Sequence, residues 1–292
     1  MKKWILAAVL LFFCIQPAVW AAPAVETERV RVPLEVEGKT FLLDAMLYKP
    51  AGEGPFPGMV ITHGTPRLAA DRAKTKADTY FVRQSQAFAQ LGIAVLFVVR
   101  RGFGISDGPN KERYLHPGGS RNYTQDGLEA AMDIGAAVRY LQAQSFVDSN
   151  RMVLLGQSTG GHSVTAAGSL NLPGVVGVVN FAGGRGSSAP DVVRDEANLI
   201  ASYAKYGKTI RVPSLWLYSQ NDHYFGPDLA RRFLKAFQAG GAEVEFISLP
   251  PYGADGHSSF VRAKDNWYAP VLEFLKRIGV VTETEAFAGW AA

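Results

Sequence analysis

Residues 151–163, RMVLLGQSTGGHS, have the pattern of a short apolar strand, a glycine-rich turn and the beginning of a helix. The turn contains G-x-S-x-G, with Ser158 at its centre between Gly156 and Gly160. This pattern is typical of a reactive serine that a strained strand-to-helix turn holds at the edge of a sheet. The same pattern also occurs around Ser106, in RRGFGISDGP. The sequence therefore offers two candidates for one role.

The surroundings of the two serines separate them. Before Ser158, MVLL is a compact apolar strand, and GHSVTAAGSL after it can continue as a helix. Glycines on both sides leave room where one backbone segment passes against another. After Ser106, Pro109 follows almost at once, and PNKERYLHPGGSRN is polar without helical periodicity. We predict that Ser158 is the nucleophile and that Ser106 belongs to a structural loop.

Short apolar runs alternate with helical segments along the rest of the chain. VRVPLEV and TFLLDAMLY flank residues 37–39 and indicate an antiparallel hairpin. Helices are predicted at about 124–142, 227–240 and 270–279. Six later runs are apolar on both faces, as expected of strands covered by helices on each side: GMVITHG, IAVLFVVR, RMVLLG, GVVGVVNFAG, PSLWLYS and AEVEFISLP. The alternation predicts an α/β fold with a mostly parallel, eight-stranded sheet flanked by helices.

The N-terminal segment has the pattern of a secretory signal peptide, residues 1–21, with two lysines, an apolar run and small residues before cleavage. The run is shorter than the roughly 20 residues that span a bilayer, so no stable membrane insertion is expected after cleavage. Residues 22–292 are then predicted to form a single exported domain, periplasmic or secreted. Cys14 is the only cysteine and leaves with the signal, so no disulfide or thiol chemistry is expected.

Composition and motifs also argue against several partners and cofactors. The formal net charge is +4 and no basic run is present, so we expect no nucleic-acid partner. EGKT and YGKT lack the first glycine of a phosphate-binding loop, and GFGISD lacks the third glycine of a dinucleotide motif. Without H-E-x-x-H or a cysteine in the mature chain, we expect no metal and no cofactor.

A serine nucleophile needs a base to accept its proton and an acid to orient that base. In a parallel sheet such groups lie beyond the carboxyl ends of the strands. His257 lies in the loop after the last predicted strand, where it can reach over the sheet edge, and Asp222 follows the preceding strand. Asp255 is two residues from His257 and too constrained to reach its ring well. The predicted triad is therefore Ser158, Asp222 and His257.

At these residues the chain resembles the α/β-hydrolases, above all the dienelactone hydrolase-like branch. It is also similar to prolyl oligopeptidase-type and X-Pro dipeptidyl peptidase-type catalytic domains. HGTP, RGFGISDG, GQSTGG, NDHYF and DGH follow the order of the family's landmarks across residues 30–278. The resemblance implies an oxyanion hole made by the backbone N–H groups of Thr65 and Thr159. Dienelactone hydrolases proper are cytosolic and use a cysteine, so this chain departs from them at Ser158 and in its export signal.

Residues near strand exits are also predicted to shape a substrate pocket. The predicted lining consists of His63, Phe103, Arg185, His223 and Tyr224. The aromatic members would form an apolar wall, and Arg185 would meet a substrate carboxylate. Arg101 is expected to brace its own loop through a buried carboxylate. Residues 189–208 are predicted to form a minimal helical cap.

These features predict an exported serine hydrolase that works through an acyl-enzyme, a carboxylesterase with a small-molecule ester as substrate. The alternative is an aminopeptidase or dipeptidyl peptidase-like serine peptidase on the same scaffold. Against it, no Glu-Glu pair that could hold a free amine lies near a strand exit. A non-catalytic binding protein with a vestigial triad is a third hypothesis, which the intact serine, aspartate and histidine disfavour.

Overall fold

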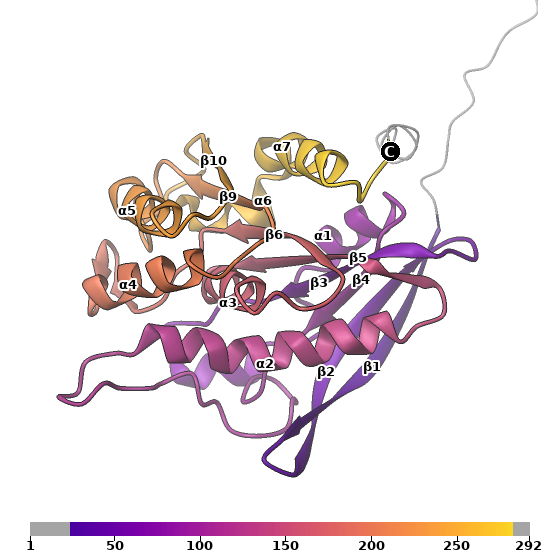
Figure 1. Ribbon diagram of the computed structural model, residues 1–292, viewed down its shortest axis with the longest axis horizontal. Helices are drawn as coiled ribbons and strands as arrows, with labels where there is room; N and C mark the ends of the chain where they lie inside the picture. The colour runs from indigo at the N-terminus through magenta and orange to yellow at the C-terminus, as the bar shows by residue number, and fades with distance from the viewer. Residues whose placement is uncertain (1–23, 283–292) are drawn as a thin grey trace, which may run out of the picture.

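The computed structural model describes residues 24–282, which fold around an eight-stranded sheet (Figure 1). Its strands are β1 (Val25–Val36), β2 (Lys39–Pro50), β3 (Phe56–Thr62), β4 (Ala94–Val98), β5 (Val147–Gln157), β6 (Val175–Phe181), β9 (Ser214–Ser219) and β10 (Val244–Leu249). They lie in the order β1-β2-β4-β3-β5-β6-β9-β10. The pairs β1–β2 and β2–β4 are antiparallel, and every later pair is parallel. The predicted mostly parallel sheet is confirmed.

The predicted hairpin forms where the sequence places it. Val36 pairs with Lys39, and the two residues between them, Glu37 and Gly38, have φ angles of 50° and 73°. Positive φ at both central positions matches the right-handed twist of the flanking strands. The hairpin adds an antiparallel edge to the parallel part of the sheet.

Helices cover both faces of the sheet, which explains why its central strands are largely apolar on both faces. On one face lie α2 (Tyr123–Gln142), α3 (Thr159–Gly168), α4 (Glu196–Gly207) and α5 (Pro227–Gln238). On the other lie α1 (Val82–Ala89), α6 (Ser259–Arg262) and α7 (Lys264–Arg277). All five residues of β4 are buried between these layers. Two short 3₁₀ helices, η1 (Ala69–Lys74) and η2 (Gly256–Ser258), lie in loops.

The last helix differs from the prediction, because α7 begins at Lys264 and contains Pro270 in its interior. A proline there removes one helical hydrogen bond. Trp267 is fully buried and packs against Phe88, Phe181 and Phe260. Burial of this large ring outweighs the lost bond and extends the helix toward its N-terminus.

The predicted cap is small, as expected. It consists of the two-stranded hairpin of β7 (Ser187–Ala189) and β8 (Val192–Val193), followed by α4. Within residues 24–282, no helix has both the length and the apolar character needed to cross a membrane. The predicted signal peptide lies outside the described residues.

Candidate active site

Ser158 occupies the sharp turn between β5 and α3. Its φ and ψ are 59° and −124°, a conformation that is strained for any residue with a side chain. Backbone hydrogen bonds hold this geometry, because the Ser158 N–H donates to the Phe181 carbonyl and the Ser158 carbonyl accepts from Gly184. The turn places the serine at the carboxyl edge of the sheet and at the N-terminus of α3.

The glycines of the motif are required by close backbone packing. A Cβ on Gly156 would lie 2.2 Å from the Gly160 carbonyl oxygen, and one on Gly160 would lie 2.5 Å from the Thr62 carbonyl oxygen. A Cβ on Gly64 would lie 2.9 Å from the Ser158 Cβ. The spacing of G-x-S-x-G is thus a packing requirement of this turn, and the loop after β3 contacts the serine directly.

Asp222, which is buried, and His257, which is partly exposed, form a pair beyond the ends of β9 and β10. The Asp222 Oδ2 atom lies 2.9 Å from the His257 Nδ1 atom. The other carboxylate oxygen accepts backbone N–H groups from Tyr224 and Phe225, at 2.7 and 2.9 Å. A carboxylate can only accept at Nδ1, so this nitrogen carries the proton and Nε2 is left as the basic nitrogen.

Asp255, the rejected alternative acid, has a different task. Its Oδ1 atom accepts the backbone N–H groups of His223 and His257, at 3.1 and 2.9 Å. It therefore fixes the loop that carries His257 and does not contact the ring through a hydrogen bond.

Ser158 and His257 come from neighbouring loops that are tied together. The Gln157 side chain, next to the serine, donates to the His257 carbonyl at 3.1 Å. Tyr224 stacks on the imidazole with the ring centres 4.0 Å apart. Among the described residues, no hydrogen bond joins the serine hydroxyl to the imidazole, and the two side chains line different hollows that share Tyr224. Catalytic hydrogen bonds often tighten only when substrate binds.

Thr65 and Thr159 lie beside the serine. Their hydroxyl groups are 2.8 Å apart, and the buried guanidinium of Arg100 reaches both, at 3.5 and 3.3 Å. Thr159 is the first residue of α3, where backbone N–H groups have no helical acceptor. The contact between the two hydroxyls therefore joins the loop after β3 to the beginning of α3, next to Ser158.

Ser106 has a structural environment. It is buried, its hydroxyl donates to the Val99 carbonyl at 2.7 Å, and it accepts the Asp44 N–H at 2.8 Å. No helix follows it before Tyr123 in the described chain. Its hydroxyl is committed to joining the loop after β4 to β2.

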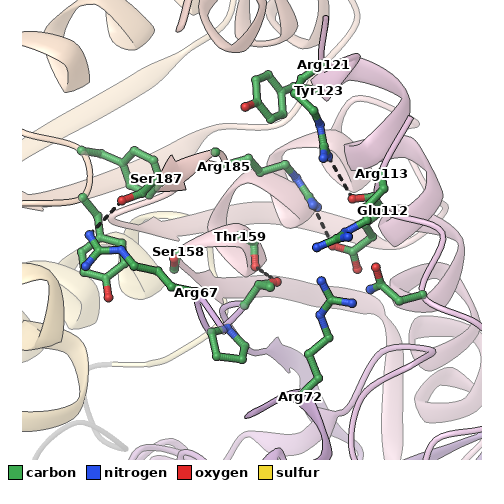
Figure 2. A pocket seen from close by; sticks show the side chains of 16 residues that line it. Arg67, Arg72, Glu112, Arg113, Arg121, Tyr123, Ser158, Thr159, Arg185 and Ser187 are labelled. Carbon is green, nitrogen blue, oxygen red and sulfur yellow. Dashed lines mark hydrogen bonds and ion pairs between the residues drawn. The ribbon is translucent and has the colours of Figure 1, made fainter. Parts of the chain in front are cut away.

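The hollow at Ser158 has a volume of about 160 Å³ and is lined by loops that follow β3, β4, β6 and β9. Figure 2 shows Ser158 and Thr159 on its floor with several arginines around them. Of the predicted pocket residues, Arg185 and Tyr224 line this hollow.

Three of the predicted pocket residues, His63, Phe103 and His223, do not line the hollow at Ser158. His63 and Phe103 are buried and pack ring against ring, with centres 4.7 Å apart. Burial lowers the pKa of His63 well below its ordinary value, and its Nε2 accepts the Arg100 N–H. His223 lies outside the hollow, where its ring bonds to Asp191. The first two positions follow strands but turn inward into the core.

The arginines singled out in the sequence are both paired. Arg101 donates to Asp133 at 2.7 Å and to Glu129 at 2.9 Å, so it braces its loop against α2 as expected. Arg185 donates to Glu112 at 2.7 Å, and also to His162 and Ser163.

Glu112, which sequence reasoning missed, joins two buried arginines. Its second oxygen accepts from Arg100 at 2.7 Å. Burial alone would raise the pKa of Glu112, but Arg100 and Arg185 outweigh it and hold this pKa well below the usual range. The carboxylate therefore stays charged and links the loop that bears it to the Thr65–Thr159 contact through Arg100. The sequence signal that could have pointed to Glu112 was the high density of charged residues in PNKERYLHPGGSRN.

No group of acidic, histidine or cysteine side chains within residues 24–282 is arranged to hold a metal ion.

A family model described as the prolyl oligopeptidase family matches residues 79–171, about a third of the chain. This segment includes α1, β4, α2, β5 and the Ser158 turn. Among curated proteins, no sequence match was found.

Solved structures share the arrangement of the whole described chain. A protein described as a dienelactone hydrolase from Klebsiella pneumoniae has a TM-score of 0.59 and 14% identity, covering 87% of this chain and 98% of that one. An esterase from Pyrococcus furiosus has a TM-score of 0.59 and 16% identity, covering 87% and 94%. An acylaminoacyl peptidase from Pyrococcus horikoshii has a TM-score of 0.66 and 21% identity, covering 89% of this chain. The chain spans only 43% of that peptidase's length.

Proposed function

We propose that this chain, whose fold is that of the α/β-hydrolases, is a serine hydrolase that cleaves small carboxylic esters through an acyl-enzyme. The observation that carries the proposal is Ser158, held in a strained turn that lines a hollow, with the Asp222–His257 pair on two neighbouring loops. Backbone strain at a serine that lines a hollow is typical of a nucleophile turn.

In the proposed reaction, the Ser158 oxygen bonds to the carbonyl carbon of the ester as its proton passes to the Nε2 atom of His257. The backbone N–H groups of Thr65 and Thr159 receive the developing negative charge on the carbonyl oxygen. The carbon–oxygen bond to the alcohol then breaks, and the alcohol leaves with the proton from His257. Water repeats the sequence on the acyl-enzyme and releases the carboxylic acid. Asp222 keeps the Nδ1 proton in place throughout.

A serine peptidase is the second candidate, because the matching family model is that of the prolyl oligopeptidase family. A peptidase that trims N-termini needs a group to hold a free amine. In the hollow at Ser158, Glu112 is the single acidic lining residue of the described chain, and it is already bonded to Arg100 and Arg185. This charge balance favours the esterase.

We expect short acyl esters to be better substrates than peptides. The measurement compares kcat/KM for p-nitrophenyl acetate and butyrate with kcat/KM for aminoacyl-p-nitroanilides. Esters are intrinsically easier to cleave, so an enzyme without dedicated amine recognition should prefer them. A fluorophosphonate probe should label Ser158, whereas a binding protein with a vestigial triad would stay unlabelled. A tenfold or greater preference for the anilides would favour the peptidase, since only dedicated amine recognition could reverse the order.

We also propose that the protein is exported, on the pattern of residues 1–21. The mature chain should begin near Ala22 and be found outside the cytoplasm in soluble form. Intact-mass measurement of the periplasmic and secreted fractions checks this. A mass that retains residues 1–21 would contradict the proposal.

A further inference from the structure

The hollow at Ser158 has an unusual balance of charge. Five arginines line it, and Glu112 is the one carboxylate among its described lining residues. Glu112 is saturated by Arg100 and Arg185, both buried. The arginines that line the hollow are Arg67, Arg72, Arg113, Arg121 and Arg185. The hollow therefore has an excess of positive charge that its own carboxylate does not balance.

Three of these arginines already have partners. Arg185 bonds to Glu112, and Arg121 pairs with Asp126. Arg67 donates to Ser187 at 2.9 Å, and its guanidinium stacks on the Tyr224 ring at 3.7 Å. Within the described chain, the two lining arginines without such a partner are Arg72 and Arg113.

Arg72 and Arg113 form no ion pair with any carboxylate within residues 24–282. The Nε atom of Arg72 is buried and has no hydrogen-bond partner, which is costly for a donor of this kind. Burial and the charge of nearby Arg113 both lower the pKa of Arg72 from its ordinary value. Two guanidinium groups that repel each other thus line one hollow, and an anion bound there would be stabilised by both.

Contacts within the protein hold Arg72 in position before any ligand binds. Its carbonyl accepts the N–H groups of Gly104 and Thr75, and its guanidinium lies over the Phe103 ring. Figure 2 shows the side chain pointing into the hollow toward Glu112, with Thr159 nearer to it in this view than Ser158. A bound anion would therefore lie in the same hollow as the nucleophile.

The placement of His257 indicates which part of the substrate enters this hollow. The imidazole lines a separate hollow with Tyr252 and Val261, which shares Tyr224 with the hollow at Ser158. In an acyl-enzyme mechanism the histidine protonates the leaving alcohol, so the alcohol lies on the His257 side. The acyl group then occupies the arginine-lined hollow. Its volume of about 160 Å³ resembles the roughly 150 Å³ cavity that accepts a benzene, so the acyl group is small.

We infer that the preferred substrate is an ester whose short acyl chain ends in a carboxylate, and that Arg72 and Arg113 bind this carboxylate. The inference rests on the proposed function, because it assigns the acyl side from the roles of Ser158 and His257. It adds a specificity determinant that neutral esters do not use.

The test compares monoethyl esters of succinic, glutaric and adipic acid with ethyl butanoate, pentanoate and hexanoate, in which a methyl group replaces the carboxylate. Released ethanol is measured. We expect kcat/KM to favour the charged ester about tenfold to a hundredfold at one chain length or more, as charge-assisted hydrogen bonds allow. Raising the salt concentration should reduce the preference, because Arg113 is exposed.

Arg72→Gln and Arg113→Gln should each reduce this charged-to-neutral ratio at least fivefold, mainly through KM of the charged ester. The matched control is Arg231→Gln, since Arg231 is exposed on α5 and pairs with Asp228 away from the hollow. It should leave the ratio at the wild-type value. A wild-type ratio of one or less at every chain length would overturn the inference.

Fluorophosphonate labelling separates this failure from failure of the proposed function. If Ser158 is labelled and neutral esters are cleaved without a charge preference, the serine hydrolase stands and the anion site is wrong. If neither labelling nor cleavage occurs, the proposed function fails, and calorimetric titration with glutarate tests the anion site alone. Glutarate should then bind the wild type at least tenfold more tightly than Arg72→Gln, and equal affinities would overturn the inference.

Discussion

Ser158→Ala should lower kcat/KM for small esters by about 10⁶-fold and abolish labelling by a fluorophosphonate, since removal of the nucleophile in such triads costs this order of rate. The hydroxyl makes no hydrogen bond that the fold requires among those described, because the turn is held by backbone bonds to Phe181 and Gly184. The variant should therefore unfold at nearly the wild-type temperature. Ester hydrolysis, probe labelling and thermal unfolding are measured on the same preparation.

Ser106→Ala is the matched control, since Ser106 is the centre of the other G-x-S-x-G pattern. Its hydroxyl bonds to Val99 and Asp44 in a buried position, so its loss should cost about 1–3 kcal/mol of stability. Most of the activity and all of the labelling should remain in the folded protein. The opposite outcome, an inactive Ser106→Ala and an active Ser158→Ala, would transfer the nucleophile assignment to Ser106.

The sheet could be predicted from the sequence because its physical requirements are local. Strands are apolar where helices cover both faces, and all of β4 and residues 152–156 of β5 satisfy this. The hairpin turn was predictable for the same reason, since Gly38 tolerates the left-handed conformation that such a turn needs. Local pattern and tertiary structure agree at these elements.

The beginning of α7 could not be predicted from local signals. Proline is favoured in the first turn of a helix, so Pro270 suggested a start. The observed start at Lys264 depends on Trp267, whose burial among rings from α1, β6 and α6 is a long-range contact. A sequence pattern does not show which rings will meet.

The lining of the hollow was the least predictable part. Position after a strand suggested His63 and Phe103, yet whether such a side chain points into the hollow or the core depends on its loop. Arg72 and Arg113 come from loops far apart in the sequence, and neither belongs to a motif. Their proximity is a property of the fold and not of any short segment.

Asp222→Asn should slow ester hydrolysis by about 10⁴-fold, because it would give His257 the wrong tautomer. Backbone N–H groups of Tyr224 and Phe225 occupy one carboxylate oxygen, so an asparagine would keep its carbonyl oxygen there. Its NH₂ group would then face the His257 Nδ1 atom and donate to it, in the place where Asp222 now accepts. The ring proton would move to Nε2, which could no longer accept a proton from Ser158. The measurement is kcat/KM across the pH range for a p-nitrophenyl ester.

Asp255→Asn is the control that makes this assignment decisive. Both hydrogen bonds of the Asp255 carboxylate, from the backbone N–H groups of His223 and His257, reach the same oxygen, Oδ1. An asparagine carbonyl can accept both, so the loop should keep its shape and kcat/KM should fall by less than about tenfold, a loss of under roughly 1.4 kcal/mol in transition-state stabilisation. If Asp255→Asn proves more damaging than Asp222→Asn, the acid of the triad is Asp255, because the two substitutions remove the same charge and differ only in which partner loses an acceptor.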